Sequence, residues 1–259
     1  MSLLFGDNYK GKINLTGRPD AFNGLFKNNT KVINAKNLSL PAITLIKYCY
    51  MSMFEGCTSL TTAPELPATA LESGCYGEIF RGCTSLITAP ELPATTLADN
   101  CYGGMFEDCT NLTTAPKLLP ATTVAYQCYS GMFSGCTSLV TAPELPATTL
   151  AENCYSGMFT NCTSLTTAPE LPATTLAKAC YHAIFYGCTS LTTAPELPAT
   201  TLAEYCYYYM FQNCTNLVTA PELLATTLVK ACYYGMFYNC SKLTTAPELP
   251  ATTLAAGCY

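Results

Sequence analysis

The feature that most constrains this chain is a phrase of 26 residues that recurs eight times from Cys49 onward. One copy, from Cys154 to Ala179, reads CYSGMFTNCTSLTTAPELPATTLAKA. The interval between first cysteines is 26 residues everywhere except between Cys101 and Cys128, where it is 27. A fixed period of roughly 20–50 residues is typical of solenoids, in which each unit buries its apolar side only against its neighbours. The repeat therefore predicts one elongated domain with long, regular outer surfaces, which favours binding over catalysis.

The composition excludes two classes of partner. Charged residues make up 11% of the 259 residues and the net charge is −5, whereas binding to nucleic-acid phosphates needs clustered Lys and Arg. No apolar run approaches the roughly 20 residues of a membrane span. The first residues, MSLLFGDNYK, lack the basic stretch and long apolar core of a signal peptide. We therefore expect neither a nucleic-acid partner nor membrane insertion.

The first nine residues of each repeat predict a short helix. In the copy that begins at Cys154, apolar residues recur at i, i+4 and i+8, with Tyr155 and Phe159 beside them at i+1 and i+5. This spacing is typical of one apolar stripe on a helix of two to three turns. The positions between the stripe residues vary freely from copy to copy, and we expect them to face solvent.

The segment that follows predicts a short strand. One of its columns contains only Thr, Ile and Val, which suit a strand. The adjoining column is Thr in all eight copies, and a proline two residues later should end the strand after three or four residues. Strands stack about 4.8 Å apart whereas helices need about 8–10 Å, so the stack should curve. The predicted fold is an α/β solenoid, a right-handed stack with short parallel strands on the concave face and short helices on the convex face.

The chain divides into three parts. Residues 49–259 hold the eight repeats and the first two residues of a ninth. Residues 21–48 follow the repeat with drift, because Leu25 and Phe26 stand where Met and Phe belong and Asn29 replaces the second cysteine. We interpret them as a degenerate repeat, and residues 1–20 as an N-terminal cap. No polar capping repeat closes the C-terminal end, so we expect a fragment of a longer protein that could associate end to end.

The phrase MFxxCTSLTTAPELP resembles the BspA-like leucine-rich repeats of bacterial surface proteins, and the match covers about residues 24–259. The repeats here are slightly longer than the usual unit and carry an additional Cys-Tyr pair. The resemblance implies a leucine-rich-repeat solenoid with an extracellular or cell-surface binding role, and similar arrays occur in phage tail proteins. It implies no catalytic residues and no defined ligand.

Seventeen cysteines leave three interpretations open. A disulfide framework is disfavoured, because residues at i and i+8 of a helix are about 12 Å apart, beyond the roughly 4.4–6.8 Å between bridged Cα atoms. Metal binding is disfavoured because the C-x7-C spacing is not a zinc spacing and His182 is the only histidine. Packing as a small buried apolar residue is the interpretation we favour.

Two regular ladders are candidate surfaces. A glutamate recurs at one position of seven repeats, with Lys117 as the exception in the third; bound cations could relieve the repulsion between these carboxylates, although a solvated acidic edge also explains them. A threonine ladder could bind glycans or ice on the concave face, or could simply reflect strand propensity. Its members are Thr62, Thr88, Thr114, Thr141, Thr167, Thr193, Thr219 and Thr245.

A less regular set is the candidate binding site. The outer columns carry small or charged residues in repeats one to five, whereas repeats six to eight carry aromatic ones. Exposed tyrosine-rich patches mark protein or sugar contacts, although drift on a surface of low charge would also explain them. The set comprises His182, Tyr186, Tyr205, Tyr208, Tyr209, Tyr234 and Tyr238.

No catalytic motif, phosphate-binding loop or metal-binding motif is present in the sequence, so we expect no enzyme, metal or cofactor. The leading prediction is an extracellular or cell-surface binding or adhesion module whose partner is a protein or a glycan on another surface. The alternative is a structural spacer or fibre segment, for example in a phage tail or an end-to-end assembly. The one additional residue beside Lys117 should form a local kink or loop.

Overall fold

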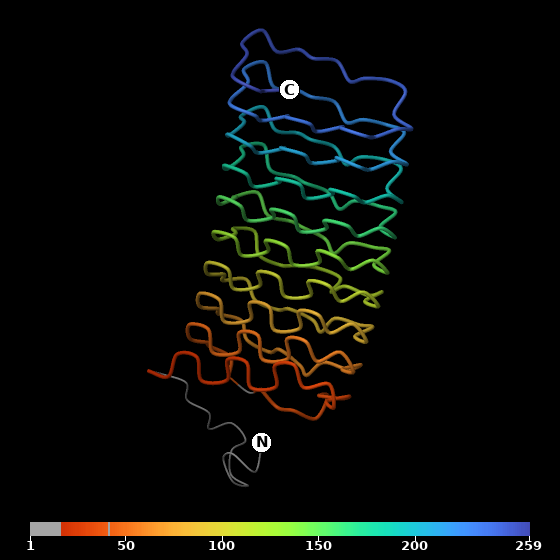
Figure 1. Cartoon of the computed structure of the whole chain (residues 1–259). Coiled ribbons are helices and arrows are strands. Elements are labelled where there is room, and N and C mark those ends of the chain that lie inside the picture. Colours follow the sequence, from red (N-terminus) through yellow and green to blue (C-terminus); the bar gives the residue numbers. More distant parts are fainter. Residues whose placement is uncertain (1–16, 41) are drawn as a thin grey trace.

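The computed structural model of the chain describes residues 17–40 and 42–259. Successive repeats lie on top of one another as coils of an elongated stack, with the first and last coils at opposite ends (Figure 1). The predicted solenoid is therefore confirmed, while the right-handed sense of the coil stays a prediction. Residues 1–16 of the predicted cap lie outside the described residues.

The first nine residues of each repeat form consecutive β-turns. In the first repeat the Met53 N–H donates to the Tyr50 carbonyl at 3.2 Å, and the Cys57 N–H donates to the Phe54 carbonyl at 3.0 Å. The N–H groups of Tyr50 and Phe54 instead donate to carbonyls of the next coil. The Tyr50 N–H, for example, donates to the Cys75 carbonyl at 3.0 Å. Donors thus alternate between the turn and the neighbouring coil. We call these nine residues and their equivalents the turn segment.

Each turn segment has a left-handed residue at every fourth position. In the first repeat these are Tyr48, Ser52 and Gly56, with φ of 55°, 52° and 69°. A positive φ at the third residue is the property that defines a type II turn and favours Gly or Asn. The last of the three columns holds only Gly, Asn and Asp: Gly56, Gly82, Asp108, Gly135, Asn161, Gly187, Asn213 and Asn239.

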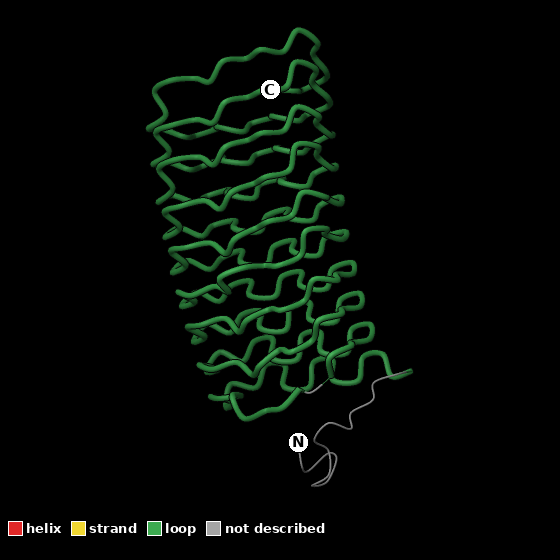
Figure 2. Tube along the Cα trace, turned by 180° about the vertical axis from the view of Figure 1, so that it is seen from behind, coloured by secondary structure: helices red, strands yellow, loops and turns green. Residues whose placement is uncertain are grey.

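The predicted helix is therefore wrong. The described part of the chain contains no α-helix. Turns and loops form every coil in its place (Figure 2). Over nine residues, a turn period of four and a helix period of 3.6 place the same residues on the buried side. The Gly/Asn/Asp column distinguishes them, since a left-handed residue before the second cysteine would interrupt a helix.

The predicted strands are also shorter than expected. Neighbouring coils pair through isolated parallel bridges of single residues. One line of bridges runs through the threonine ladder and includes Thr114↔Thr141 and Thr141↔Thr167. A second line runs through the next threonine-rich step and includes Thr123↔Thr149 and Thr175↔Thr201. Two prolines separate the two lines in most coils, and proline cannot donate to a ladder.

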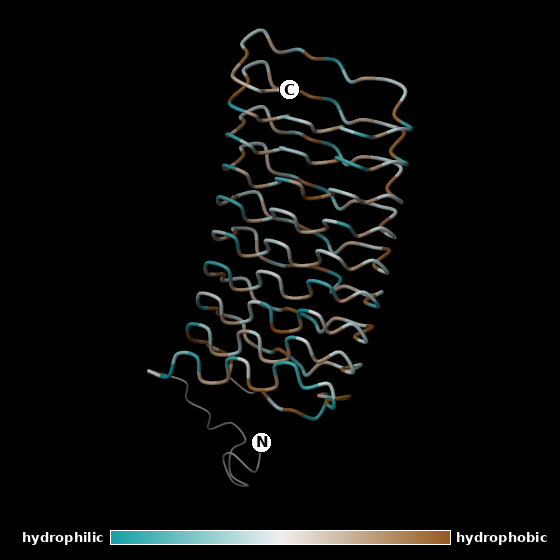
Figure 3. Ribbon diagram, in the orientation of Figure 1, coloured by the Kyte–Doolittle hydropathy of each residue, from teal (hydrophilic) through white to brown (hydrophobic). Residues whose placement is uncertain are grey.

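The core consists of buried side chains that repeat from coil to coil, and Figure 3 colours the coils by the hydropathy of their residues. Tyrosine rings stack in one row and phenylalanine rings in another, as in Tyr129–Tyr155 at 5.6 Å and Phe133–Phe159 at 5.7 Å between ring centroids. These spacings are close to the roughly 4.8 Å between paired strands. Because no helix forces one side of the stack apart, the predicted contrast between a concave and a convex face loses its physical basis.

Residues 22–40 and 42–48 lie on the first repeat with the contacts of a repeat. Phe22 stacks on Tyr50 at 5.5 Å and Phe26 stacks on Phe54 at 5.2 Å. Asn34 forms a parallel bridge to Thr62 in the first line of bridges. This coil therefore covers the aromatic rows at the N-terminal end of the repeats.

The additional residue in the third repeat is absorbed locally. Leu118 forms a parallel bridge to Glu144, and the Glu144 N–H donates to the Lys117 carbonyl at 2.9 Å. The two lines of bridges continue on either side at Thr114 and Thr123. The additional residue thus adds a pairing contact without shifting the later coils out of register.

All seventeen cysteines are buried and free. The second cysteines of the repeats form one row, which we call the second row, and they donate their Sγ–H to a phenylalanine carbonyl of the preceding coil. Cys109 donates to Phe80 and Cys162 donates to Phe133, both at 3.1 Å. Burial raises the pKa of the Cys109 and Cys162 thiols to about 12. Equivalent cysteines lie on neighbouring coils and not on separated helices, so the helix-spacing argument against disulfides does not apply. Burial explains both sets of cysteines, and the repeated Sγ–H bond to a phenylalanine carbonyl adds to it at the second cysteine of each repeat.

Candidate binding surface

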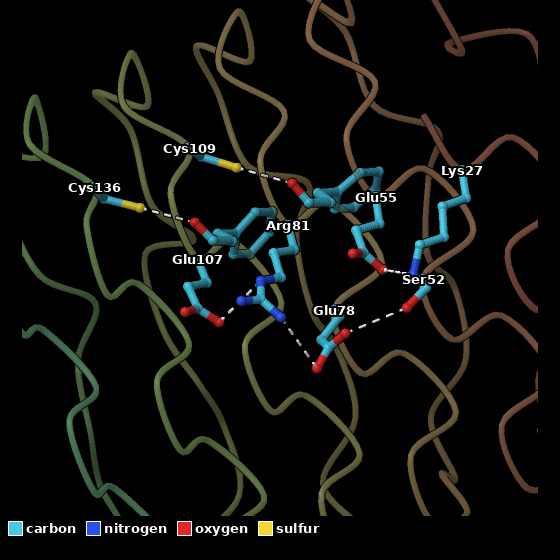
Figure 4. A network of polar contacts seen from close by, with 10 residues as sticks. Lys27, Ser52, Glu55, Glu78, Arg81, Glu107, Cys109 and Cys136 are labelled. Atoms are coloured by element: carbon cyan, nitrogen blue, oxygen red, sulfur yellow. Dashed lines mark hydrogen bonds and ion pairs between the residues drawn. The ribbon is translucent and has the colours of Figure 1, made fainter. Parts of the chain in front are cut away.

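The variable positions of the turn segment form one face of the stack, and its character changes along the axis. The degenerate repeat and the first three repeats carry a charged network (Figure 4). Lys27 pairs with Glu55 at 2.7 Å, and Arg81 lies between Glu78 at 3.7 Å and Glu107 at 3.3 Å. Burial opposes ionisation of Glu55, but the contact with Lys27 outweighs it and lowers the pKa of this carboxyl. Burial raises the pKa of Glu107.

Small and polar side chains occupy the middle of this face. They line a shallow depression of about 300 Å³ between the charged network and the aromatic residues, and its floor includes Gly104, Gly131 and Gly157. The Ser130 hydroxyl donates to the Ser156 carbonyl at 3.1 Å. The middle repeats thus present hydroxyls and backbone in place of large side chains.

Aromatic rings occupy the last three repeats. His182, Tyr208 and Tyr234 hold the same column and stack along the axis, with centroid separations of 5.3 and 5.1 Å and interplanar angles of 17° and 11°. Tyr209 lies against Tyr208 at 4.2 Å and 55°. Tyr205 meets Tyr208 edge-on at 5.7 Å. We call these five residues the aromatic cluster.

Two further contacts shape the aromatic cluster. A β-carbon on Gly235 would meet the Tyr209 ring, so this glycine allows the ring to lie against the next coil. Lys230 places its ammonium 5.3 Å from the centroid of the Tyr205 ring, a cation–π distance. The hydrogen bond that the Tyr209 hydroxyl donates to Tyr208 raises the pKa of the Tyr209 phenol. The cluster therefore offers phenol hydroxyls and ring edges to a partner.

The structure brings together five of the seven predicted site residues. Tyr186 and Tyr238 lie in another column, separated by Gln212, and neither has a ring contact with the aromatic cluster. His182 and Tyr186, and likewise Tyr234 and Tyr238, are four residues apart, but this spacing does not place them on one helix face because no helix is present there. Tyr238 is 67% exposed.

His182 has a neighbour that the sequence analysis missed. The Ser156 hydroxyl lies 3.1 Å from its Nδ1 atom, one coil away. Burial lowers the pKa of the imidazole. Within the described residues no carboxylate bonds to this ring, so the pair has no acidic partner of the kind found in catalytic triads. A search by repeat column would have revealed the pair, since Ser156 and His182 are 26 residues apart.

A second regular surface follows the residues between the two lines of bridges. We call it the Pro-Glu strip; it comprises Ala63–Pro67 and the equivalent residues of the other repeats, bordered by the threonine ladder. Depressions of about 510 Å³ and about 410 Å³ lie on it, the first across repeats one and two and the second across repeats four and five. Thr62 is half-buried, and the other seven threonines of the ladder are exposed.

Comparison with known families identifies the architecture. The family model described as BspA type Leucine rich repeat region matches six copies, over residues 23–165 and 119–244. The chain belongs to the BspA-type leucine-rich repeat family. BspA-type repeats thus account for the coils from the degenerate repeat to the eighth repeat. No curated protein and no solved structure gives a significant match to the chain.

Two features are absent from the described residues of this BspA-type array. None of its residues form a helix of the length and apolarity that a bilayer crossing needs. In the same part of the chain, no three His, Cys, Asp or Glu side chains are grouped so that they could hold a metal ion.

Proposed function

We propose that this BspA-type array is a non-enzymatic binding or adhesion module that acts outside the cell or on its surface. BspA-type repeats suggest a repeat-based binding role and are typical of surface proteins, and the family is typically non-catalytic. The observation that carries the proposal is the aromatic cluster, since it interrupts an otherwise uniform array.

The tyrosines of the cluster are not needed to build the coil. Repeats three to five place Gly or Ser in the column of His182, Tyr208 and Tyr234 and still stack in register. Tyr234 is 41% exposed, so a partner can reach its ring. Tyrosine gives large, rigid contact area at small entropic cost and is enriched in binding surfaces. The partner that this chemistry fits is a protein or a glycan on another surface.

A triple variant tests the proposal. Replacing Tyr208, Tyr209 and Tyr234 by Ser should abolish binding to immobilised glycans or surface proteins that the parent chain captures, without changing the thermal midpoint by more than a few degrees. Tyr126→Ser is the matched control, because Tyr126 is 42% exposed and lies outside the cluster. Retained binding by the triple variant would refute the assignment of this surface.

A structural spacer or fibre segment is the second candidate function. The last coil presents an apolar depression of about 370 Å³, lined by residues that include Phe237, Leu249 and Tyr259. Leu249 is 55% and Leu254 is 63% exposed, although the equivalent leucines of earlier repeats are covered by the next coil. Light scattering that shows concentration-dependent filaments, lost in Leu249→Glu, would favour this candidate; a monomer at all concentrations would exclude it.

A further inference from the structure

The depression of about 300 Å³ over repeats three to five is bounded by two walls of different chemistry, and we call it the polar depression. Its N-terminal wall is formed by Glu78 and Glu107, which hold Arg81 between them (Figure 4). At its C-terminal end lies Ser156, whose hydroxyl is 3.1 Å from Nδ1 of His182. The polar depression is therefore continuous with the aromatic cluster.

The aromatic column ends at His182 with one face of the imidazole not covered by another ring. His182 stacks on Tyr208 at 5.3 Å with an interplanar angle of 17°, and Tyr208 stacks on Tyr234 in the same way. The opposite face of the imidazole is turned toward the fifth repeat, where Ser156 holds the position that aromatic residues hold in the next three repeats. A flat ring of a ligand can therefore extend the stack into the polar depression.

The floor of the polar depression is kept open by glycine. Gly131 and Gly157 have left-handed backbones, with φ of 61° and 62°, and a β-carbon on Gly131 would meet nothing within 4 Å. Asn100, Gln127 and Ser134 also line the depression, and their side chains form no hydrogen bond within the described residues. Three side chains that can both donate and accept hydrogen bonds are thus available to a ligand.

This combination selects among classes of ligand. Arg81 balances only one of the two wall carboxylates, so the site disfavours phosphates and other anions. A volume of about 300 Å³ is at the lower limit of small-molecule sites, whereas a stable protein interface needs about 800 Å² from each partner. An apolar ligand would leave the amides and hydroxyls of the floor without hydrogen bonds. A neutral pyranose sugar fits, since it has a face of C–H groups for His182 and hydroxyls around its edge.

We propose that the polar depression binds the terminal sugars of a neutral pyranose glycan, with one sugar ring stacked on the uncovered face of His182. The depression extends over about 10 Å from the third to the fifth coil, at roughly 4.8 Å per coil, which is long enough for two sugar rings. The floor amides and hydroxyls bond to the sugar hydroxyls, and Glu78 and Glu107 accept hydrogen bonds at the other end. This inference rests on the proposed binding role and narrows the partner to a glycan.

Titration of the full chain with lactose, cellobiose and maltose, followed by saturation-transfer NMR, tests the proposal. We expect at least one of these neutral disaccharides to bind. His182→Ser should weaken that binding roughly tenfold or more, because it removes the ring face, and repeats four and five already hold Ser in this column. His182→Tyr should keep the binding, since Tyr208 and Tyr234 occupy the same column and a tyrosine ring restores the face.

A variant that fills the site gives the sharpest comparison. Ser156→Tyr extends the aromatic stack by one ring into the space assigned to the sugar, so it should abolish binding of the disaccharide. Met51→Tyr is the matched control, because it adds the same side chain to the same column in the first repeat, outside the depression. This control should bind the disaccharide as the parent chain does.

Four results would overturn the proposal. They are binding of none of the three disaccharides, equal binding by Ser156→Tyr and Met51→Tyr, unchanged affinity in His182→Ser, and equal affinity for an analogue of the bound disaccharide with a uronic acid as its terminal sugar. Capture of a surface protein that is lost in the Tyr-to-Ser triple variant but kept in Ser156→Tyr would support the proposed binding role without the sugar site, which separates the two failures.

Discussion

The side-chain oxygen of Asn161 occupies the space that a β-carbon on Gly187, one coil further along, would need. The same relationship joins Asp108 to Gly135. Both glycines have a left-handed backbone, with φ of 70° at Gly187 and 74° at Gly135. Within this column, an Asn or Asp on one coil thus requires a glycine on the next unless, as at Asn213 and Asn239, the two amides bond to each other at 2.9 Å.

Gly187→Ala should therefore be destabilising. The left-handed conformation alone costs an Ala about 1 kcal/mol, and displacement of the exposed Asn161 side chain should bring the loss to about 1–2 kcal/mol, measured by urea unfolding. Gly131→Ala is the control, because Gly131 has φ of 61° but nothing within 4 Å of the added carbon. Equal losses in the two variants would show that the contact with Asn161 has no energetic role.

The second row of cysteines should also contribute to stability through its hydrogen bond. Cys162→Ala removes the Sγ–H donor from the Phe133 carbonyl, which is 3.1 Å away, and leaves a small void. We expect a loss of about 1–2 kcal/mol in the free energy of unfolding. The Phe133 carbonyl also accepts the Cys136 N–H at 3.0 Å, so the change should not unfold the coil. A stabilised Cys162→Ala variant would contradict this account.

Reactivity of the thiols provides a separate prediction. Thiolates and not thiols attack disulfide reagents, and burial raises the pKa of thiols such as Cys101 and Cys154 to about 12. The reduced native protein should therefore show almost no rapid reaction with a thiol-titrating reagent at neutral pH. In denaturant all seventeen should react. Near-complete reaction in the native state would contradict the buried rows.

The solenoid could be predicted because the repeat of 26 residues can be read directly from the sequence. The buried rows of Cys, Tyr, Phe and Leu were predictable for the same reason. The turn geometry was not predicted, since nine residues cannot separate a period of four from one of 3.6. The position before the second cysteine, which holds only Gly, Asn or Asp, was the sign that the segment forms turns and not a helix.

The candidate surfaces were predictable only in part. Stacking of His182, Tyr208 and Tyr234 follows from their shared column once the coil spacing is known. The position of Tyr209 against Gly235 depends on a side-chain rotamer and on the left-handed backbone, which the sequence does not specify. The Pro-Glu depressions depend on how two prolines direct the chain between the lines of bridges.

Removal of the Tyr102 hydroxyl from the core should not destabilise the fold. This hydroxyl is buried without a hydrogen-bond partner among the described residues, as are the hydroxyls of Tyr50, Tyr76 and Tyr129. Tyr102→Phe should therefore leave the free energy of unfolding unchanged or raise it by up to about 1 kcal/mol. Tyr102→Leu should lose about 1–3 kcal/mol, because it breaks the ring stack with Tyr76 and Tyr129. A large loss in Tyr102→Phe would mean that the hydroxyl has a stabilising partner.

Alkaline pH should destabilise the fold steeply. Burial raises the pKa of Cys109 and Cys162 from 9.0 to about 12, so these thiols stay neutral in the folded state where the unfolded chain ionises. Their contribution is complete below pH 9.0 and is lost as the pH rises through about 12. Each thiol costs about 1.4 kcal/mol per pH unit in this window. Urea unfolding from pH 7 to pH 11 should show a plateau and then a fall above about pH 9; a flat profile to pH 11 would contradict the burial of the cysteine rows.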